Sequence, residues 1–162
     1  MPNWCENEVN IYGKKEDLQK FLQECMSKSE ESDKGGYDRV LDFTKVIPEP
    51  DYETTPVAHT FPSIHAAFAK TEEEKQVALK NEPTIREDAE WDWRVQHWGT
   101  KWDLSEMNVL DVDDDYICMN FDTAWGPPEG IYDALVKKYP DLHISWFYNE
   151  PGVQMAGYLG KD

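Results

Sequence analysis

Four tryptophans stand within twelve residues of one another, a density that could serve molecular recognition. They are Trp91, Trp93, Trp98 and Trp102. Large amphipathic indole rings can stack on a nucleotide base or anchor a partner protein. The favoured alternative is core packing, because Trp91, Val95 and Trp98 share one face of a predicted helix and aromatic residues at this spacing usually point inward. Trp93 lies off that face, so we expect its ring to be the most exposed of the four.

The motif WGTKWD at 98–103 adds a small-residue turn, one cation and one anion to the cluster. Lys101 and Asp103 could hold the phosphate and the donor groups of a ligand, but a single lysine lacks the glycine-rich cradle of a phosphate loop. The simpler interpretation, which we favour for most of the motif, is that Gly99 ends the helix and the tryptophans fix it against the sheet.

No catalytic or metal-binding motif accompanies these residues. Aspartates at 111 and 113–115 crowd one predicted turn, but they lack the glycine and the closing glutamate of a calcium loop, so a solvated turn is favoured. The histidines (His59, His65, His97 and His143) show no zinc spacing. We therefore expect no catalytic residues, no metal and no cofactor, and a metal-dependent hydrolase built from convergent carboxylates is the least supported alternative.

Composition narrows the class of protein further. The 162 residues carry 33 acidic and 16 basic side chains, a formal net charge of −17, which argues against direct nucleic-acid binding and against anionic membrane surfaces. A hydrophobic fraction of 40% excludes a disordered acidic tail. Three scattered cysteines and an N-terminus without an apolar segment predict a reduced, cytoplasmic protein.

Hydrophobic periodicity predicts the elements that must position these residues. Helices are predicted at 14–28, 71–80, 84–98 and 128–139, the middle two opening on capping boxes at Thr71 and Thr84; strands are predicted at 5–12, 107–112, 116–123, 142–149 and 153–159, and a short extended stretch at 41–47. The order predicts an α+β fold with a ferredoxin-like antiparallel sheet, the split βαβ arrangement, and an extra C-terminal strand. Residues 1–162 then form a single domain with a helical insertion at about 51–105.

Four short motifs lie where these elements meet: MPNWCEN at 1–7, WGTKWD at 98–103, FDTAWGPP at 121–128, and the NEPG turn at 149–152 followed by Gly157. In this order they resemble the YubB-like ferredoxin-fold family of phage and plasmid proteins. The resemblance implies a ferredoxin-like fold encoded by a mobile element, and it brings no catalytic residues. The motif positions are candidate binding residues, to which the cluster adds Trp93: Trp4, Asn7, Trp93, Trp98, Thr100, Lys101, Trp102, Asp103, Thr123, Trp125 and Glu150.

Two functions follow as hypotheses. The first is a non-enzymatic interaction protein of a phage or plasmid that binds or antagonises a host protein with a basic surface, with mimicry of DNA charge as a special case. The second is a small-ligand or nucleotide-binding protein in which a ring stacks between tryptophans and polar contacts come from Asn7, Thr100, Lys101 or Thr123. Residues 82–115 hold 11 acidic and three basic residues beside the clustered tryptophans, so this segment is the first candidate for a partner surface.

Overall fold

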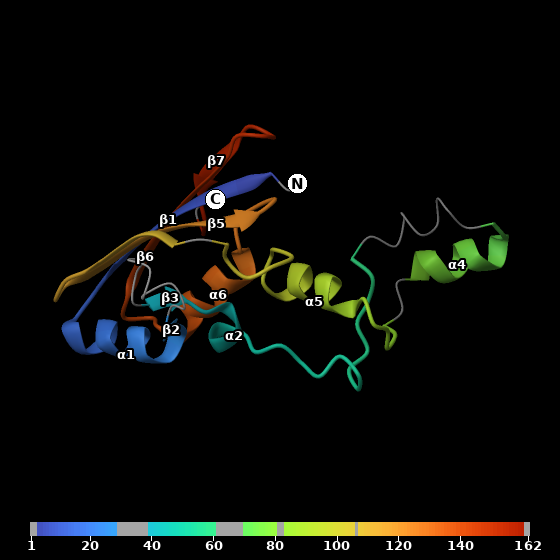
Figure 1. Ribbon diagram of the computed structural model, residues 1–162, viewed down its shortest axis with the longest axis horizontal. Helices are drawn as coiled ribbons and strands as arrows, with labels where there is room; N and C mark the ends of the chain where they lie inside the picture. The colour runs from blue at the N-terminus through green and yellow to red at the C-terminus, as the bar shows by residue number, and fades with distance from the viewer. Residues whose placement is uncertain (1–2, 29–38, 61–69, 81–82, 106, 161–162) are drawn as a thin grey trace.

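A computed structural model describes residues 3–28, 39–60, 70–80, 83–105 and 107–160 (Figure 1). Its strands are β1 (Trp4–Tyr12), β2 (Met26–Lys28), β3 (Arg39–Leu41), β4 (Met107–Val112), β5 (Tyr116–Ala124), β6 (His143–Glu150) and β7 (Met155–Tyr158). Its helices are α1 (Lys15–Cys25), α2 (Phe43–Val46), α4 (Glu72–Lys80), α5 (Ala89–His97) and α6 (Glu129–Lys138).

The main sheet has five antiparallel strands in the order β4-β5-β1-β6-β7. On the central strand β1, Val9 lies opposite Met119 of β5 and Trp146 of β6. The succession β1, α1, β4, β5, α6, β6 is the split βαβ arrangement, and β7 adds a strand at the β6 edge. The predicted α+β, ferredoxin-like fold with an extra C-terminal strand is confirmed.

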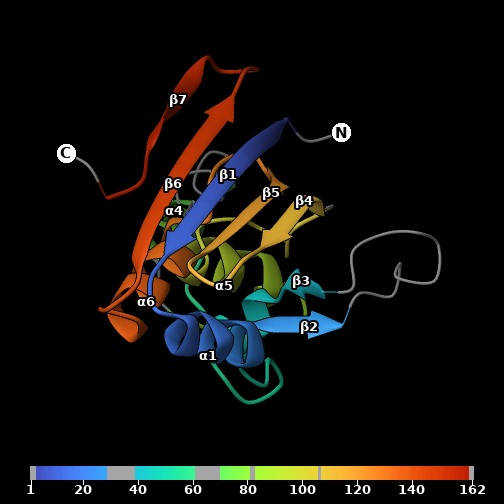
Figure 2. The ribbon, with the colours of Figure 1, turned by 90° about the vertical axis from the view of Figure 1, so that its left-hand side faces the viewer.

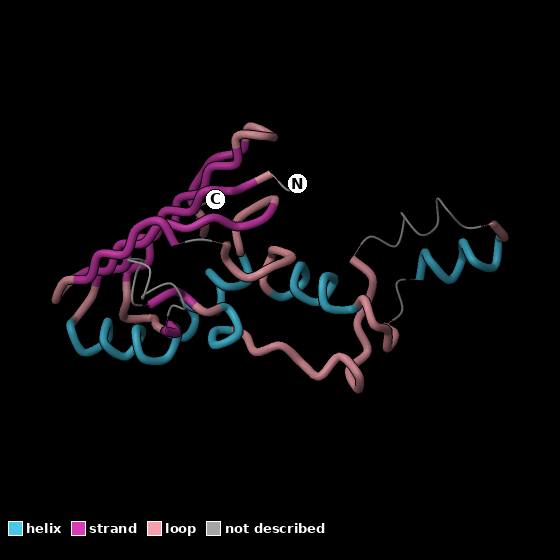
Figure 3. Tube along the Cα trace, in the orientation of Figure 1, coloured by secondary structure: helices cyan, strands magenta, loops and turns pink. Residues whose placement is uncertain are grey.

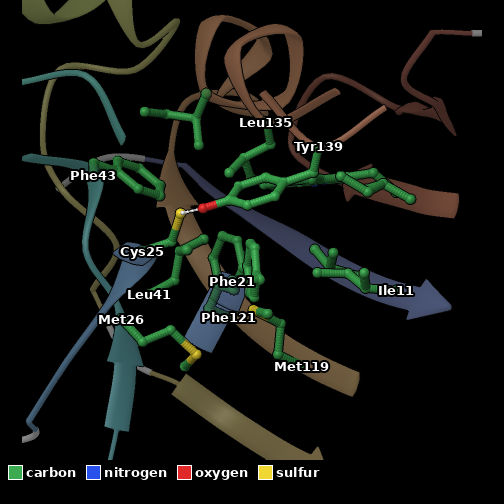
Figure 4. Close-up of a cluster of buried hydrophobic side chains, with 14 of the residues drawn as sticks. Ile11, Phe21, Cys25, Met26, Leu41, Phe43, Met119, Phe121, Leu135 and Tyr139 are labelled. Atoms are coloured by element: carbon green, nitrogen blue, oxygen red, sulfur yellow. Dashed lines mark hydrogen bonds between the residues drawn. The ribbon is translucent and has the colours of Figure 1, made fainter. Parts of the chain in front are cut away.

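Helices α1, α5 and α6 lie on one face of this sheet and leave the other face open (Figure 2), while α4 lies away from the sheet (Figure 1). Alternation along β1 explains the division: Cys5, Asn7, Val9 and Ile11 point toward the helices and are buried, while the residues between them face outward. The buried cluster joins β1 and β5 to α1 and α6, and within it the Cys25 thiol lies 3.2 Å from the Tyr139 hydroxyl (Figure 4).

Two predicted elements, the helix at 14–28 and the extended stretch at 41–47, differ from the structure. The helix predicted over 14–28 ends at Cys25, and Met26–Lys28 instead pairs with Arg39–Leu41 as a separate two-stranded sheet. The extended stretch predicted at 41–47 contains the helical turn α2, because the carboxylate of Asp42 accepts a hydrogen bond from the Thr44 amide, 3.0 Å away, and so caps it.

Of the two predicted capping boxes, the structure confirms one and contradicts the other. The box at Thr71 is confirmed, since its hydroxyl accepts a hydrogen bond from the Glu74 amide at 3.1 Å. The box at Thr84 is wrong as a helix start: Thr84 pairs its backbone with Val57, and α5 begins only at Ala89. The partner of Thr84 is 27 positions away in the sequence, which a local pattern cannot anticipate.

The loop from 47 to 60 lies along α5 and fixes it in place (Figure 3). The Nε1 atom of Trp98 donates to the Ile47 carbonyl at 3.0 Å, and Arg94 forms an ion pair with Glu49. Arg86 forms a buried ion pair with Asp92. These contacts set which side of α5 faces the protein interior.

Candidate functional site

Four of the seven tryptophans are exposed to solvent, with 38–51% of their surface accessible, while the other three are buried. The exposed rings are those of Trp4, Trp91, Trp102 and Trp125. They come from β1, α5, the loop after α5 and the turn after β5. The fold therefore gathers a residue near the N-terminus with residues from positions 91–125.

The orientation predicted for α5 is wrong. Trp93, expected to be the most exposed ring, is 7% exposed and stacks on His97 with their ring centroids 4.3 Å apart. Trp91, expected to point inward, is one of the exposed rings. The physical reason is the 47–60 loop: Tyr52 packs edge-on against Trp93, with ring centroids 6.3 Å apart, and buries that side of the helix.

Lys101 links two of the exposed rings, those of Trp102 and Trp125. Its ammonium nitrogen lies 4.2 Å from the ring centroid of Trp102 and 5.3 Å from that of Trp125. Trp102 in turn lies beside Trp4, with ring centroids 6.4 Å apart. We call Trp91, Trp125, Lys101, Trp102 and Trp4 the tryptophan band.

One end of the band borders an open groove of about 350 Å³ between α5 and the turn after β5. Its lining consists of Trp91, Val95, Gly99, Thr100, Lys101, Ala124, Trp125 and Gly126. Most of this lining is apolar, and the Thr100 hydroxyl already donates to the Ala124 carbonyl at 2.9 Å. Lys101 supplies the one charged side chain of the lining, so the groove suits an apolar or aromatic group.

The candidates Asn7 and Thr123 are buried and shape the turn that carries Trp125. The Asn7 amide donates to the Thr123 hydroxyl at 2.9 Å, and that hydroxyl donates to the Gly126 carbonyl at 2.7 Å. Trp125 has a φ of +70°, uncommon for a non-glycine residue, and its amide donates to the Asn3 carbonyl at 2.8 Å. Asn7 and Thr123 therefore position the turn of the band from within the protein interior.

Two further candidates are buried for structural reasons. Trp98 is fully buried at the end of α5, where its indole donates to the Ile47 carbonyl. The carboxylate of Glu150 accepts hydrogen bonds from the amides of Gly152, at 3.1 Å, and Val153, at 2.7 Å, and so holds the turn before β7.

Asp103 follows Trp102 in the loop after α5 and is partly buried. Its carboxylate accepts a hydrogen bond from the Leu104 amide at 2.7 Å. Burial raises the pKa of this carboxyl from 3.8 to about 6, and the negative charge of nearby Asp42 contributes in the same direction. Near neutral pH, the ionised carboxylate of Asp103 therefore lowers the free energy of unfolding.

A second hollow, of about 330 Å³, lies on the open face of the sheet, and the candidate residues predicted from sequence include none of its outward side chains. Glu6, Glu8, Asn120, Asp122, Phe147 and Asn149 point into it from β1, β5 and β6. The alternation of β1 already places Glu6 and Glu8 on one face, but the neighbours of that face depend on strand order.

The described residues form neither a metal-binding cluster nor a membrane-spanning helix. Among them, no three His, Cys, Asp or Glu side chains come together as a metal site. The Asp111 carboxylate accepts a hydrogen bond from the Tyr116 hydroxyl at 2.7 Å, within the predicted hairpin. No helix in the described ranges has the length and apolar character required to cross a bilayer.

Comparison with known proteins supports the fold. Residues 97–161 match the family model described as the ferredoxin-like domain in Api92-like protein. The crystal structure of protein api92 from Yersinia pseudotuberculosis aligns with 98% of this chain and 93% of its own, with a TM-score of 0.53 and 13% sequence identity. At that identity the likeness concerns the fold alone. No curated protein matches the chain.

Proposed function

We propose that this chain is a non-enzymatic binding protein that recognises a partner protein with a basic surface through the tryptophan band. The observation that carries the proposal is the exposure of four tryptophans: Trp102 and Trp125 share Lys101, Trp4 lies beside Trp102, and Trp91 lines the same groove as Trp125. Large exposed aromatic surfaces are uncommon on proteins that bind nothing, and tryptophan is enriched among the residues that dominate binding energy in protein interfaces.

The chemistry of the groove favours a protein side chain over a nucleotide. A nucleotide brings phosphate charge that several donors must neutralise, whereas the lining supplies one lysine, in a protein with a net charge of −17. An apolar or aromatic side chain needs no such donors. A planar small ligand is the second candidate, supported by the groove volume of about 350 Å³, which falls in the range of small-molecule sites.

The charge of the chain supports a basic partner. An acidic surface attracts a basic one over a Debye length and raises the association rate, with an effect that falls as salt rises. The resemblance of the four sequence motifs to YubB-like proteins of phages and plasmids leads us to propose a host protein as the partner. DNA-charge mimicry is the special case in which that host protein also binds DNA.

The proposal is tested with the immobilised full chain in a bacterial lysate at low and high salt. Basic proteins captured at low salt are identified, purified and titrated against three forms of the chain: wild type, the double variant W102A/W125A, and V136A, which truncates an exposed apolar residue on α6 instead. We expect the double variant to lose binding and V136A to retain it.

Two outcomes oppose the proposal. Equal binding by W102A/W125A and V136A would exclude the band as the recognition surface. A nucleotide that quenches tryptophan fluorescence and raises the melting temperature, in wild type but not in W102A/W125A, would replace the protein partner by the second candidate.

A further inference from the structure

We propose that the hollow on the open face of the sheet binds an arginine side chain of the partner, beside the apolar residue that the tryptophan band holds. This inference rests on the proposed function, because it specifies the partner of the same surface. It assigns a role to Glu6, Glu8 and Asp122, which lie in the hollow and outside the tryptophan band.

Strand register brings the carboxylates of the hollow together. Glu6 lies opposite Asp122 of β5 and Asn149 of β6. In the next outward row of the same face, Glu8 lies opposite Asn120 and Phe147. Three acidic side chains from two strands therefore surround one depression of about 330 Å³, with a phenyl ring at its side.

Two glutamates of the hollow, Glu6 and Glu8, offer carboxylate oxygens as hydrogen-bond acceptors. Within the described part of the chain, neither Glu6 nor Glu8 takes part in an ion pair; Glu6 accepts from the Asn149 amide at 3.1 Å, and Glu8 from the Asn10 amide at 3.4 Å. The side-chain oxygen of Asn120 is buried and accepts no hydrogen bond. A guanidinium has five N–H donors and no acceptor, so it complements this arrangement.

Phe147 favours arginine over lysine. Its ring lines the hollow and is itself supported by Tyr158 of β7, with ring centroids 5.2 Å apart. A planar guanidinium stacks on an aromatic face and binds carboxylates in a forked geometry, while an ammonium is a compact and strongly hydrated charge.

The hollow adjoins the Trp4 end of the tryptophan band on the open face. Trp4, at one end of the band, precedes Glu6 by two residues on the same face of β1, a separation of about 7 Å at the usual rise of a strand. An extended segment spans that distance in two residues, and a helix in three or four. The partner sequence should therefore carry an arginine two to four positions from the large apolar residue that lies against Trp4.

In the test, peptides from a displayed random library are selected for binding to the immobilised full chain, so no partner has to be known beforehand. A synthetic peptide of the enriched sequence is then titrated, alone and with its arginine replaced by alanine. The protein variants are W102A/W125A, E6Q/E8Q, and the control E53Q/E73Q, which removes two exposed carboxylates far along the chain with the same change in net charge.

We expect enrichment of an aromatic or large aliphatic residue with an arginine at the stated spacing. E6Q/E8Q should weaken binding about tenfold or more, as should loss of the arginine, and E53Q/E73Q about twofold or less. Peptides without arginine that depend on Trp102 and Trp125 and tolerate E6Q/E8Q would overturn this inference and leave the proposed function standing.

The opposite result would distinguish the arginine site in the hollow from the binding role of the tryptophan band. Arginine peptides that depend on Glu6 and Glu8 but bind W102A/W125A normally would retain the arginine site and overturn the role of the band. If no sequence is enriched, both claims are wrong.

Discussion

The backbone of Gly130 lies against the carbonyl of His97 so closely that a Cβ atom at position 130 would overlap that oxygen. The Gly130 amide also donates to the Trp98 carbonyl at 3.1 Å. Together these contacts fix the first turn of α6 on the last turn of α5. The loop that carries Lys101 and Trp102 leaves from this junction, so the geometry of the tryptophan band depends on a close approach of two backbones.

Gly130→Ala should therefore destabilise the protein by about 2 kcal/mol or more, because a clash with backbone cannot be relieved by a side-chain rotation. Urea unfolding measures the change. The matched control is Gly126→Ala, since a Cβ there meets no atom within 4 Å and should leave the stability almost unchanged. Equal stability of the two variants would show that α5 and α6 do not depend on this contact.

Asn7 should be required for a stable core although it was a candidate binding residue. Its Oδ1 accepts a hydrogen bond from the Trp146 indole at 3.0 Å, and its amide donates to Thr123. Asn7→Leu leaves the buried indole N–H and the Thr123 hydroxyl without this partner, at a cost of about 2–4 kcal/mol. Denaturant unfolding checks the value, with Asn10→Leu, on the open face of the same strand, as the control. Similar losses for both variants would count against the buried network.

Asp103 should make the protein less stable as the pH rises. Its pKa of about 6 in the folded state exceeds the ordinary 3.8, so between these values the folded state holds a proton that the unfolded state has released. The contribution of Asp103 to the free energy of unfolding is therefore greatest below about pH 4. It falls as the pH rises toward 6 and no longer changes above about pH 6. Asp103→Asn should stabilise the protein by about 2–3 kcal/mol at pH 7, and by much less at pH 4.

Urea unfolding of this variant at both pH values checks the expectation, with the exposed Asp115→Asn as a control. A gain of the same size at both pH values would mean that the substitution acts through packing and not through the charge of Asp103.

The strands and the split βαβ order could be predicted because β1 alternates throughout, and β5 and β6 over most of their length, between buried and outward residues, and because α1 and α6 carry clear apolar faces. α5 was oriented wrongly because its nine residues offer aromatic side chains on more than one side. Tyr52 and the Arg94–Glu49 ion pair decide which side is covered, and both depend on a loop about 40 residues earlier.

The candidate site was predicted in part for a similar reason. Short motifs identified Trp4, Lys101, Trp102 and Trp125, which the fold brings together, but they also included buried residues such as Asn7, whose role is structural. The hollow on the sheet was missed because its residues come from three strands. Only the register that places Glu6 between Asp122 and Asn149 reveals it.

Lys101 should hold the rings of Trp102 and Trp125 in place without contributing much to global stability. Its ammonium lies near both rings at the surface, where a cation–π contact contributes about 0.5–1 kcal/mol. Lys101→Met keeps most of the apolar stem and removes the charge, so the free energy of unfolding should change by about 1 kcal/mol or less. Acrylamide quenching of tryptophan fluorescence should increase, because the two rings lose their shared contact. Lys14→Met, at an exposed position before α1, is the control, and equal quenching of the two variants would refute the role of Lys101 in ordering the band.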